Sequence, residues 1–290
     1  MTELGVVFRP QLPPERLRGV VEAAETSGLA ELWLWEDCPL TGGIATLAAT
    51  LAWTSRLRVG IGILPLPLRP VITTAMETAT LARLFPDRLT LGVGHGAQDW
   101  MAKTGVRPAS PLTLMREHLT ALTALLDGET VTEDGRHVRL DGVGLDWPPA
   151  RRPPILVGAT KERSLRLSGE LADGTVLDQN QPPAAVRRAR AAIDEGRAAA
   201  GRTDRHELVV YLWAATGPDA TERLRRELAE WGVDEVPGLG AAGNADAVAA
   251  GVRELAEAGA DRVVLVHTAD EPDLAGFVRF AAEEVAPLVR

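Results

Sequence analysis

The sequence predicts an α/β protein that closes into a (β/α)₈ barrel of the TIM type, and three observations support this. Short apolar or β-branched runs alternate with longer segments of helical periodicity along the whole chain, which is the pattern of repeated βα units around a parallel sheet. Eight such runs are found, and eight is the strand number of this barrel. The 290 residues also suit a fold that occupies about 250 residues as one unit.

The expected strands are the short runs, each too brief to be an independent helix. In chain order they are residues 5–8, 31–35, 57–64, 89–93, 155–157, 174–177, 208–215 and 262–267.

The segments between the strands carry apolar residues at helical spacing, and several have start or stop signals. Ser110 and Pro111 suit the N-cap and first residue of a helix, and Asn244 suits an N-cap. Glycines stand where several helices should end. The expected helices are residues 14–27, 75–84, 112–126, 162–171, 184–200, 220–231, 245–258 and 274–289.

Two connections are longer than the usual few residues and are interpreted as insertions. Residues 128–154 separate the fourth and fifth strands and include a possible hairpin of 130–132 with 137–140. Residues 232–243 lengthen the step into the last unit. Neither segment has the composition of a flexible linker, so residues 1–290 are expected to form one domain.

Composition excludes several classes of function. The formal net charge of −9, with no stripe of lysine and arginine among aromatics, argues against nucleic acid as a partner. No apolar run reaches the about 18 residues of a membrane span, and the amino end lacks a signal-peptide pattern, so we expect a cytoplasmic protein. The single cysteine, Cys38, and five histidines without paired spacing predict no metal site.

In such a barrel the residues that follow each strand form the functional face, so they are the candidates for chemistry. Glu36 and Asp37 follow the second strand and bring at least one carboxylate to the barrel mouth. That carboxylate either hydrogen-bonds a cofactor ring or substrate, or caps the next helix and pairs with a rim arginine. Cys38 is reactive only if its thiolate is stabilised, and otherwise it packs passively.

The run GVGHG at residues 92–96 contains Gly94, His95 and Gly96 after the fourth strand. With Ala97 it matches the spacing of a dinucleotide-binding turn, but that motif belongs at the first βα turn of an open sheet. We instead interpret the glycines as a turn open to close approach by a ring or phosphate. His95 is either a ring contact or proton donor, or an ordinary loop residue.

A second candidate cradle is VGATKERS at residues 157–164, where a strand ends at Gly158, Ala159 and Thr160 and a helix begins soon after. Free backbone N–H groups, a hydroxyl and Lys161 suit a phosphate there, although a plain turn with a threonine cap explains the pattern equally well.

These segments together resemble the bacterial-luciferase-like superfamily of flavin- and deazaflavin-dependent oxidoreductases. The likeness centres on residues 56–96, which read RLRVGIGILPLPLRPVITTAMETATLARLFPDRLTLGVGHG. It extends through LWLWED (32–37), REHLTALTALLDGETV (116–131), PPILVGATKERSLRLSGELADG (153–174) and AGADRVVLV (258–266). The ED pair followed by two glycines and an alanine-rich helix is most similar to the branch that uses coenzyme F-420, as in methylenetetrahydromethanopterin reductases.

The resemblance implies hydride transfer between F-420 and a small organic substrate, in a protein that is commonly a homodimer. It also implies a bulge in the third strand, often with a non-prolyl cis peptide, that backs the cofactor's middle ring; the matching bond is Gly62–Ile63. The resemblance assigns Asp37 to the ring edge, Leu64 and Pro65 to the flank of the bulge, His95 to the loop after the fourth strand, and Gly158 and Ala159 to backbone contacts with the cofactor. We expect Asp37 or His95 to polarise the ring or relay a proton. The predicted cofactor site is completed by Gly62 and Ile63 of the bulge and by the strand-end candidates Gly94, Gly96 and Thr160.

Some positions depart from the family pattern. Cys38 and Ala97 stand where the family's sugar-phosphate dehydrogenases have histidine and glutamate, and Arg69-Pro70 is one residue shorter than a frequent Arg-His-Pro. The alternatives are an FMN-dependent monooxygenase that uses O₂, and a flavin carrier without catalysis. We expect the substrate pocket to be lined from the 128–154 insertion and the loops after the last two strands, with Trp147, Trp213 and Thr268 as candidates.

Overall fold

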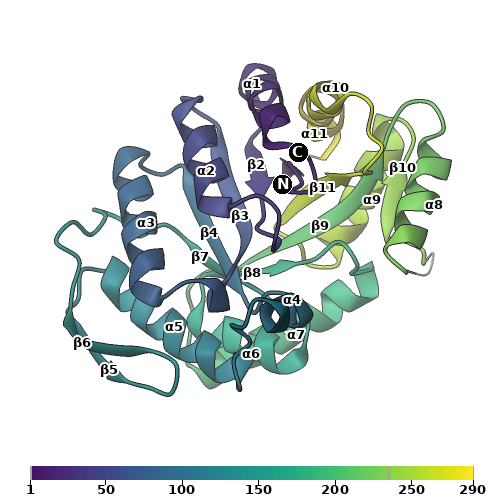
Figure 1. Ribbon diagram of the computed structural model, residues 1–290. Helices are drawn as coiled ribbons and strands as arrows, with labels where there is room; N and C mark the ends of the chain where they lie inside the picture. Colours follow the sequence, from purple (N-terminus) through teal and green to yellow (C-terminus); the bar gives the residue numbers. More distant parts are fainter. Residues whose placement is uncertain (1, 234–235, 290) are drawn as a thin grey trace.

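The computed structural model describes residues 2–233 and 236–289, and eight parallel strands close into a barrel in it (Figure 1). In ring order they are β1 (Glu3–Val7), β2 (Glu31–Leu34), β3 (Arg58–Pro65), β4 (Leu89–Gly94), β7 (Ile155–Gly158), β8 (Gly174–Leu177), β9 (Glu207–Ala215) and β11 (Arg262–His267). The ring is closed because β9 pairs with β8 as well as with β11. The predicted (β/α)₈ barrel is confirmed.

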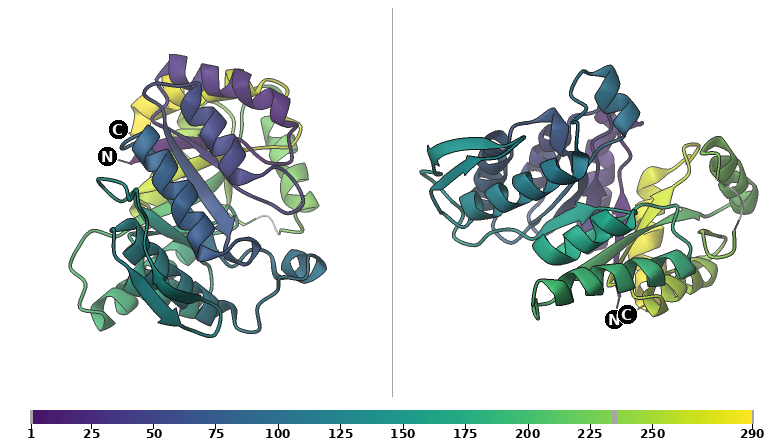
Figure 2. Two further views of the ribbon diagram at one scale, coloured as in Figure 1. Left: turned by 60° about the vertical axis from the view of Figure 1, so that its left-hand side comes forward. Right: turned by 90° about the horizontal axis from the view of Figure 1, so that it is seen from below.

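Helices surround the strands, and the two chain ends lie close together (Figures 1 and 2). The helices are α1 (Leu17–Ser27), α2 (Gly43–Ala52), α3 (Val71–Leu84), α4 (Gln98–Lys103), α5 (Pro111–Leu126), α6 (Glu162–Leu171), α7 (Pro183–Ala199), α8 (Ala220–Glu230), α9 (Ala245–Glu257), α10 (Leu274–Arg279) and α11 (Ala286–Val289). Within the described ranges, no helix combines the length and apolarity needed to cross a membrane.

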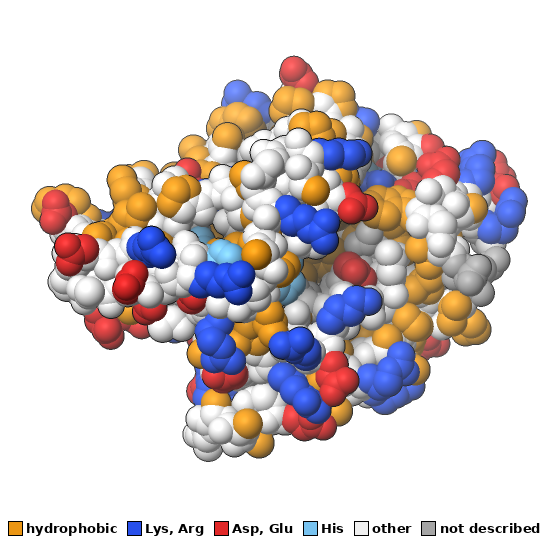
Figure 3. All heavy atoms as spheres, turned by 60° about the horizontal axis from the view of Figure 1, so that its bottom comes forward, with side chains coloured by type: hydrophobic (Ala, Val, Ile, Leu, Met, Phe, Trp, Pro, Cys, Tyr) orange, Lys and Arg blue, Asp and Glu red, His pale blue; other side chains and the backbone are white. Residues whose placement is uncertain are grey.

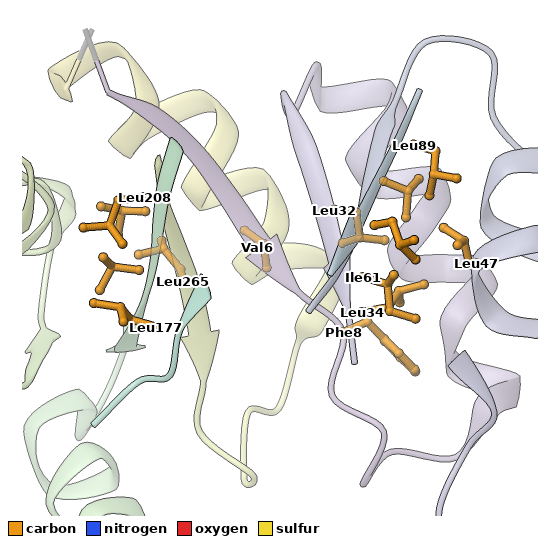
Figure 4. Packing of buried hydrophobic residues seen from close by; sticks show 14 of the residues in the cluster. Val6, Phe8, Leu32, Leu34, Leu47, Ile61, Leu89, Leu177, Leu208 and Leu265 are labelled. Atoms are coloured by element: carbon orange, nitrogen blue, oxygen red, sulfur yellow. The ribbon is translucent and has the colours of Figure 1, made fainter. Parts of the chain in front are cut away.

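The larger hydrophobic core lies between the strands and the helices outside them. Figure 4 shows Leu32 and Leu34 of β2, Ile61 of β3 and Leu89 of β4 grouped with Leu47 of α2. All five side chains are nearly inaccessible to solvent, and burying one such side chain contributes about 1.5–3 kcal/mol to folding. This layer makes the strands a rigid support for the residues at their ends.

A second, smaller core fills the barrel interior and is rich in aromatic residues. Trp33 of β2 and Trp35, the residue after this strand, alternate with the outward-facing leucines of β2, as the two-residue period of a strand requires. From β9, Val209, Tyr211 and Trp213 reach the same interior. The aromatic interior leads directly up to the barrel mouth.

The predicted insertion at residues 128–154 is present and forms an antiparallel hairpin of β5 (Val131–Asp134) and β6 (Arg139–Val143). The hairpin lies beside α5 at the outer edge of the molecule (Figures 1 and 2). Because this segment joins the end of α5 to the start of β7, it lies at the amino ends of the strands. The two ends of the insertion are therefore opposite the mouth, and the hairpin packs outside the barrel along α5, where Glu117 accepts hydrogen bonds from the backbone of residues 136–138.

Three local features differ from the sequence-based expectation. Helix α4 is unpredicted because six residues are too few to show a helical period. The last expected helix, 274–289, contains a π-helical stretch, Phe280–Val285, between α10 and α11. The second insertion, of which residues 234–235 lie outside the described part, contains a further short strand, β10 (Gly240–Ala242). β10 pairs with the last three residues of β9, whereas β8 pairs with the first four.

Candidate active site

A cavity of about 390 Å³ opens at the carboxyl ends of the strands. Figure 3 shows that this side of the molecule is hollowed, with lysine and arginine side chains around the hollow. The lining comes from β3, β7, β8 and β9, from the segments that follow β2, β4, β7 and β8, and from the residue that follows α8. The location agrees with the rule that barrel enzymes build their sites on this face.

One wall of the cavity is a bulge in β3. Pairing with β4 runs in register to Ile61 and resumes at Leu64, so that Gly62 and Ile63 together oppose the single residue Gly92. The Gly62–Ile63 peptide is cis, as the family resemblance implies. Gly62 and Ile63 both line the cavity.

Glycines on the neighbouring strands make room for this bulge. A Cβ on Gly92 would lie 2.3 Å from the carbonyl oxygen of Ile61, and one on Gly158 would lie 2.8 Å from Cγ2 of Ile63. Gly92 and Gly94 are therefore strand residues that accommodate the bulge, which corrects their interpretation as a turn. Only Gly96 of that run lies in the loop with a positive φ, of 66°, and lines the cavity.

Glu36 has the structural role that the sequence left open for one carboxylate of its pair. Its Oε2 accepts a hydrogen bond from the backbone N–H of Gly43 at 2.6 Å, at the first residue of α2. Both of its oxygens also accept from the guanidinium of Arg69, at 2.9 and 3.0 Å. Glu36 thus caps the helix and pairs with a rim arginine, which leaves Asp37 as the carboxylate available to a ligand.

Asp37 borders the cavity and is held by two side-chain donors. Its Oδ2 accepts from the indole N–H of Trp35 at 2.8 Å and from the amide of Gln11 at 3.1 Å. Burial raises the pKa of the Asp37 carboxyl, against the opposing effect of these hydrogen bonds and of the positive charge on Arg9. A carboxyl group with a raised pKa in a cavity is suited to proton transfer.

His95 lies on the same cavity wall as the glycine loop. Its Nε2 is 3.0 Å from the hydroxyl of Ser164, near the start of α6. Burial lowers the pKa of the imidazole, with a smaller opposing effect from a hydrogen bond to the backbone of Pro111. The ring is therefore neutral at pH 7 and is oriented by protein groups.

The chain matches known proteins in sequence and in fold. The family model for luciferase-like monooxygenases matches residues 2–264. The chain belongs to this family. It is 28% identical over 178 residues to a 5,10-methylenetetrahydromethanopterin reductase from Methanolobus tindarius, a match that covers 61% of this chain and 54% of the relative. It is 29% identical over 201 residues to an F-420-dependent glucose-6-phosphate dehydrogenase from Microbacterium testaceum, covering 67% and 60%.

In both matches the chain spans less than two thirds of the relative's length. Among solved structures, the coenzyme F-420-dependent tetrahydromethanopterin reductase from Methanopyrus kandleri has a TM-score of 0.86 at 21% identity, covering 100% of this chain and 99% of the other. That likeness shows the shared fold.

Within the luciferase-like barrel, most of the predicted site residues meet at one cavity. Those that line it are Asp37, Gly62, Ile63, Pro65, His95, Gly96, Gly158, Ala159 and Thr160. Leu64 and Gly94 do not line it. Leu64 is buried in the outer core beside Gly43 of α2, and Gly94 faces Ile63 within the sheet.

The three candidates for the substrate pocket also lie outside the cavity lining. Trp147 is 72% exposed, lies shortly before β7 in the 128–154 insertion and packs under Arg83 at the end of α3, and so it is at the amino ends of the strands. Trp213 is fully buried in the barrel interior. Thr268 is buried and accepts a hydrogen bond from Arg223.

Several residues of the luciferase-like site were not predicted. They are Trp35, Trp100, Ser164, Val176, Tyr211 and Trp231. Tyr211 and Val176 are strand residues, and their two-residue alternation with outward-facing neighbours was a usable signal. Trp100 lies in α4 and Trp231 follows α8. The rule that functional residues follow the strands does not predict residues at these positions.

Proposed function

We propose that this protein is an oxidoreductase that transfers a hydride between coenzyme F-420 and a small organic substrate. The observation that carries the proposal is the cavity at the barrel mouth, with the Gly62–Ile63 bulge as one wall and the Asp37 carboxylate at its edge. The names of the two sequence relatives, a methylenetetrahydromethanopterin reductase and an F-420-dependent dehydrogenase, support the same chemistry.

The residues present fit a flat tricyclic ring. Such a ring needs a backing without protruding side chains, and Gly62, Gly96 and Gly158 provide backbone without a Cβ in the cavity lining. Trp35 and Trp100 add apolar surface to the lining of the same cavity. The volume of about 390 Å³ is within the range of cavities that hold ligands of this size.

The chain's own residues would bind and orient the cofactor and manage its proton. Asp37 would contact the ring edge, where its raised pKa allows it to hold or release a proton. Neutral His95 would contact the ring from the loop after β4. The Lys161 ammonium beside Thr160 would bind the phosphate, whereas the backbone N–H of Ala159 already donates to the Val176 carbonyl and does not take part. When bound, F-420 supplies the two-electron hydride chemistry.

The departures at Cys38 and Ala97 argue against a sugar-phosphate dehydrogenase, although one relative has that name. In the family's sugar-phosphate enzymes these two positions are a histidine and a glutamate. The cysteine and alanine of this chain cannot take over their acid and base roles. The substrate is therefore a different small organic molecule.

A second candidate function is an FMN-dependent monooxygenase that consumes O₂. The description of the matching family as luciferase-like monooxygenases favours it, and the same bulge and aromatic walls would accept FMN.

Equilibrium titration of the purified protein with F-420 and, separately, with FMN distinguishes the two. We expect saturable F-420 binding, and FMN binding at least about tenfold weaker. That ratio corresponds to a difference of about 1.4 kcal/mol in binding free energy. Tight FMN binding with no F-420 binding, together with O₂ consumption in the presence of reduced FMN, would establish the monooxygenase instead. Binding of neither cofactor would refute both proposals.

A further inference from the structure

Trp231 lines the cavity although it does not follow a strand. It is the residue that ends α8, and its side chain is 40% exposed while lining the mouth. In the ring of eight strands β3 and β9 are four places apart, and therefore opposite each other. The Trp231 ring packs against that of Trp213 on β9, with centroids 5.5 Å apart. Trp231 thus faces the cavity from the side opposite the Gly62–Ile63 bulge.

Buried charged groups hold the Trp231 ring in place. Its indole N–H donates to Oε1 of Glu227 at 2.9 Å. The same oxygen of Glu227 is 2.8 Å from Nη1 of Arg9, and both of these side chains are 3% exposed. The Arg9 guanidinium also lies 5.3 Å from the Trp213 ring centroid and 5.9 Å from that of Trp231. The indole is therefore oriented before any ligand binds, as a rigid recognition surface should be.

The charges around Trp231 restrict what can bind beside it. Arg9 is engaged by Glu227 and by two aromatic rings, so it offers no free positive charge. Among the described residues of the cavity lining, Lys161 is the only lysine or arginine, and it lies in the loop after β7. The loop after β8, the strand next to β9 in the ring, adds the Asp178 carboxylate and the Gln179 amide to the lining. This side can stack an apolar ring and accept hydrogen bonds, but it does not neutralise an anion.

We propose that Trp231 is the residue that determines substrate specificity, and that the substrate is a flat, uncharged organic molecule rather than a phosphorylated one. The inference rests on the proposed function, because it assigns to the substrate the half of the cavity that the cofactor would leave open. An aromatic ring stacked on tryptophan gains about 0.5–1.5 kcal/mol beyond its area of contact.

Two molecules that differ only in charge test the proposal: 2-naphthol, which is flat and neutral at pH 7, and 2-naphthyl phosphate. Calorimetric titration is done on protein saturated with oxidised F-420, so that no turnover is needed. The variants are Trp231→Ala and Trp231→Phe. The matched control is Trp53→Ala, because Trp53 ends α2, is 41% exposed and also lies under an arginine, Arg18, but is outside the cavity lining.

We expect 2-naphthol to bind the wild type at least about tenfold more tightly than 2-naphthyl phosphate. Trp231→Ala should weaken 2-naphthol binding about tenfold and Trp231→Phe no more than about threefold, since a smaller aromatic face remains. Trp53→Ala should change nothing, and F-420 affinity should be the same in all four proteins. Trp231→Phe keeps the test valid if the alanine variant does not fold.

Equal binding of the two naphthyl compounds, or 2-naphthol binding that is the same in wild type, Trp231→Ala and Trp231→Phe, would overturn the inference while leaving the proposed function intact. A wild-type protein that does not bind F-420 in the first step would instead overturn the proposed function.

Discussion

Tyr211 of β9 donates a hydrogen bond of 3.1 Å across the barrel to the carbonyl oxygen of Gly62 in the β3 bulge. Its ring packs edge-on against Trp33 and at a tilt to Trp35. Burial raises the pKa of the phenol far above its usual value, so the hydroxyl remains a donor at every working pH. The wall that we propose for the cofactor is thus tied to the opposite strand.

Replacing Tyr211 by phenylalanine tests this tie. The change keeps the ring packing but leaves the Gly62 carbonyl without this donor, which should lower the free energy of unfolding by about 1–2 kcal/mol. F-420 binding should weaken about three- to tenfold as the bulge loosens. Urea denaturation and a fluorescence titration measure the two effects. Unchanged F-420 affinity in a destabilised variant would show that the hydrogen bond serves the fold alone.

Asp37→Asn tests the proton-transfer role of this carboxyl. Because burial raises the Asp37 pKa, its ionisation should produce a limb of the kcat/KM profile above the ordinary range of aspartate, near pH 4. The variant should lose that limb and about 10²-fold in kcat, while its thermal stability stays close to wild type. A profile that keeps the same limb in the variant would assign it to another group.

Gly92→Ala tests whether the missing side chain makes room for the bulge. The new Cβ would meet the Ile61 carbonyl oxygen at 2.3 Å, and backbone must move to relieve the contact. We expect a loss of about 2–3 kcal/mol in stability and a clear loss of F-420 affinity. Gly42→Ala is the control, because no atom lies within 4 Å of a Cβ there. Equal stability of the two variants in urea would contradict the packing argument.

Buried histidines should make the protein sensitive to acid. Burial lowers the pKa of His118 to about 4, so this ring stays neutral in the folded state and is protonated on unfolding. The unfolded chain then binds more protons below its pKa of about 6.5, and stability falls as the pH drops from 6.5 towards 4. At pH 5 the cost is about 2 kcal/mol for one such histidine.

His118→Leu isolates this effect, because other groups titrate identically in both proteins. The loss of unfolding free energy between pH 7 and pH 5 should be smaller in the variant by about 2 kcal/mol. His267, whose pKa burial lowers to about 3, should behave in the same way. Identical pH dependence in wild type and variant, measured by urea denaturation, would mean that His118 takes up its proton over the same pH range in the folded and unfolded protein.

The barrel could be predicted because its strands and helices are long, periodic and regularly alternating, and those patterns arise from burial. The position of Asp37 followed from one rule, that functional residues follow the strands. The division of labour between Glu36 and Asp37 could not be predicted, since it depends on Arg69 and Gly43 reaching only one of them.

Other parts of the site depend on three-dimensional placement that local sequence does not encode. Trp231 ends a helix and reaches the mouth only because Glu227 and Arg9 orient it. Trp147 looked suitable because it lies in a long insertion, but a connection from helix to strand lies at the amino end of the barrel. The composition and length of a loop do not show at which end of the barrel it lies. The order of the elements that it joins, helix to strand or strand to helix, does show this.

The most direct test of the proposed site is a crystal structure of the protein grown with oxidised F-420. We expect the deazaflavin ring to lie in the mouth cavity against Gly62 and Ile63, with Asp37 at its edge and its other face towards Trp231. A cavity without cofactor at saturating F-420, or a ring bound away from the bulge, would contradict the assignment of this cavity as the redox site.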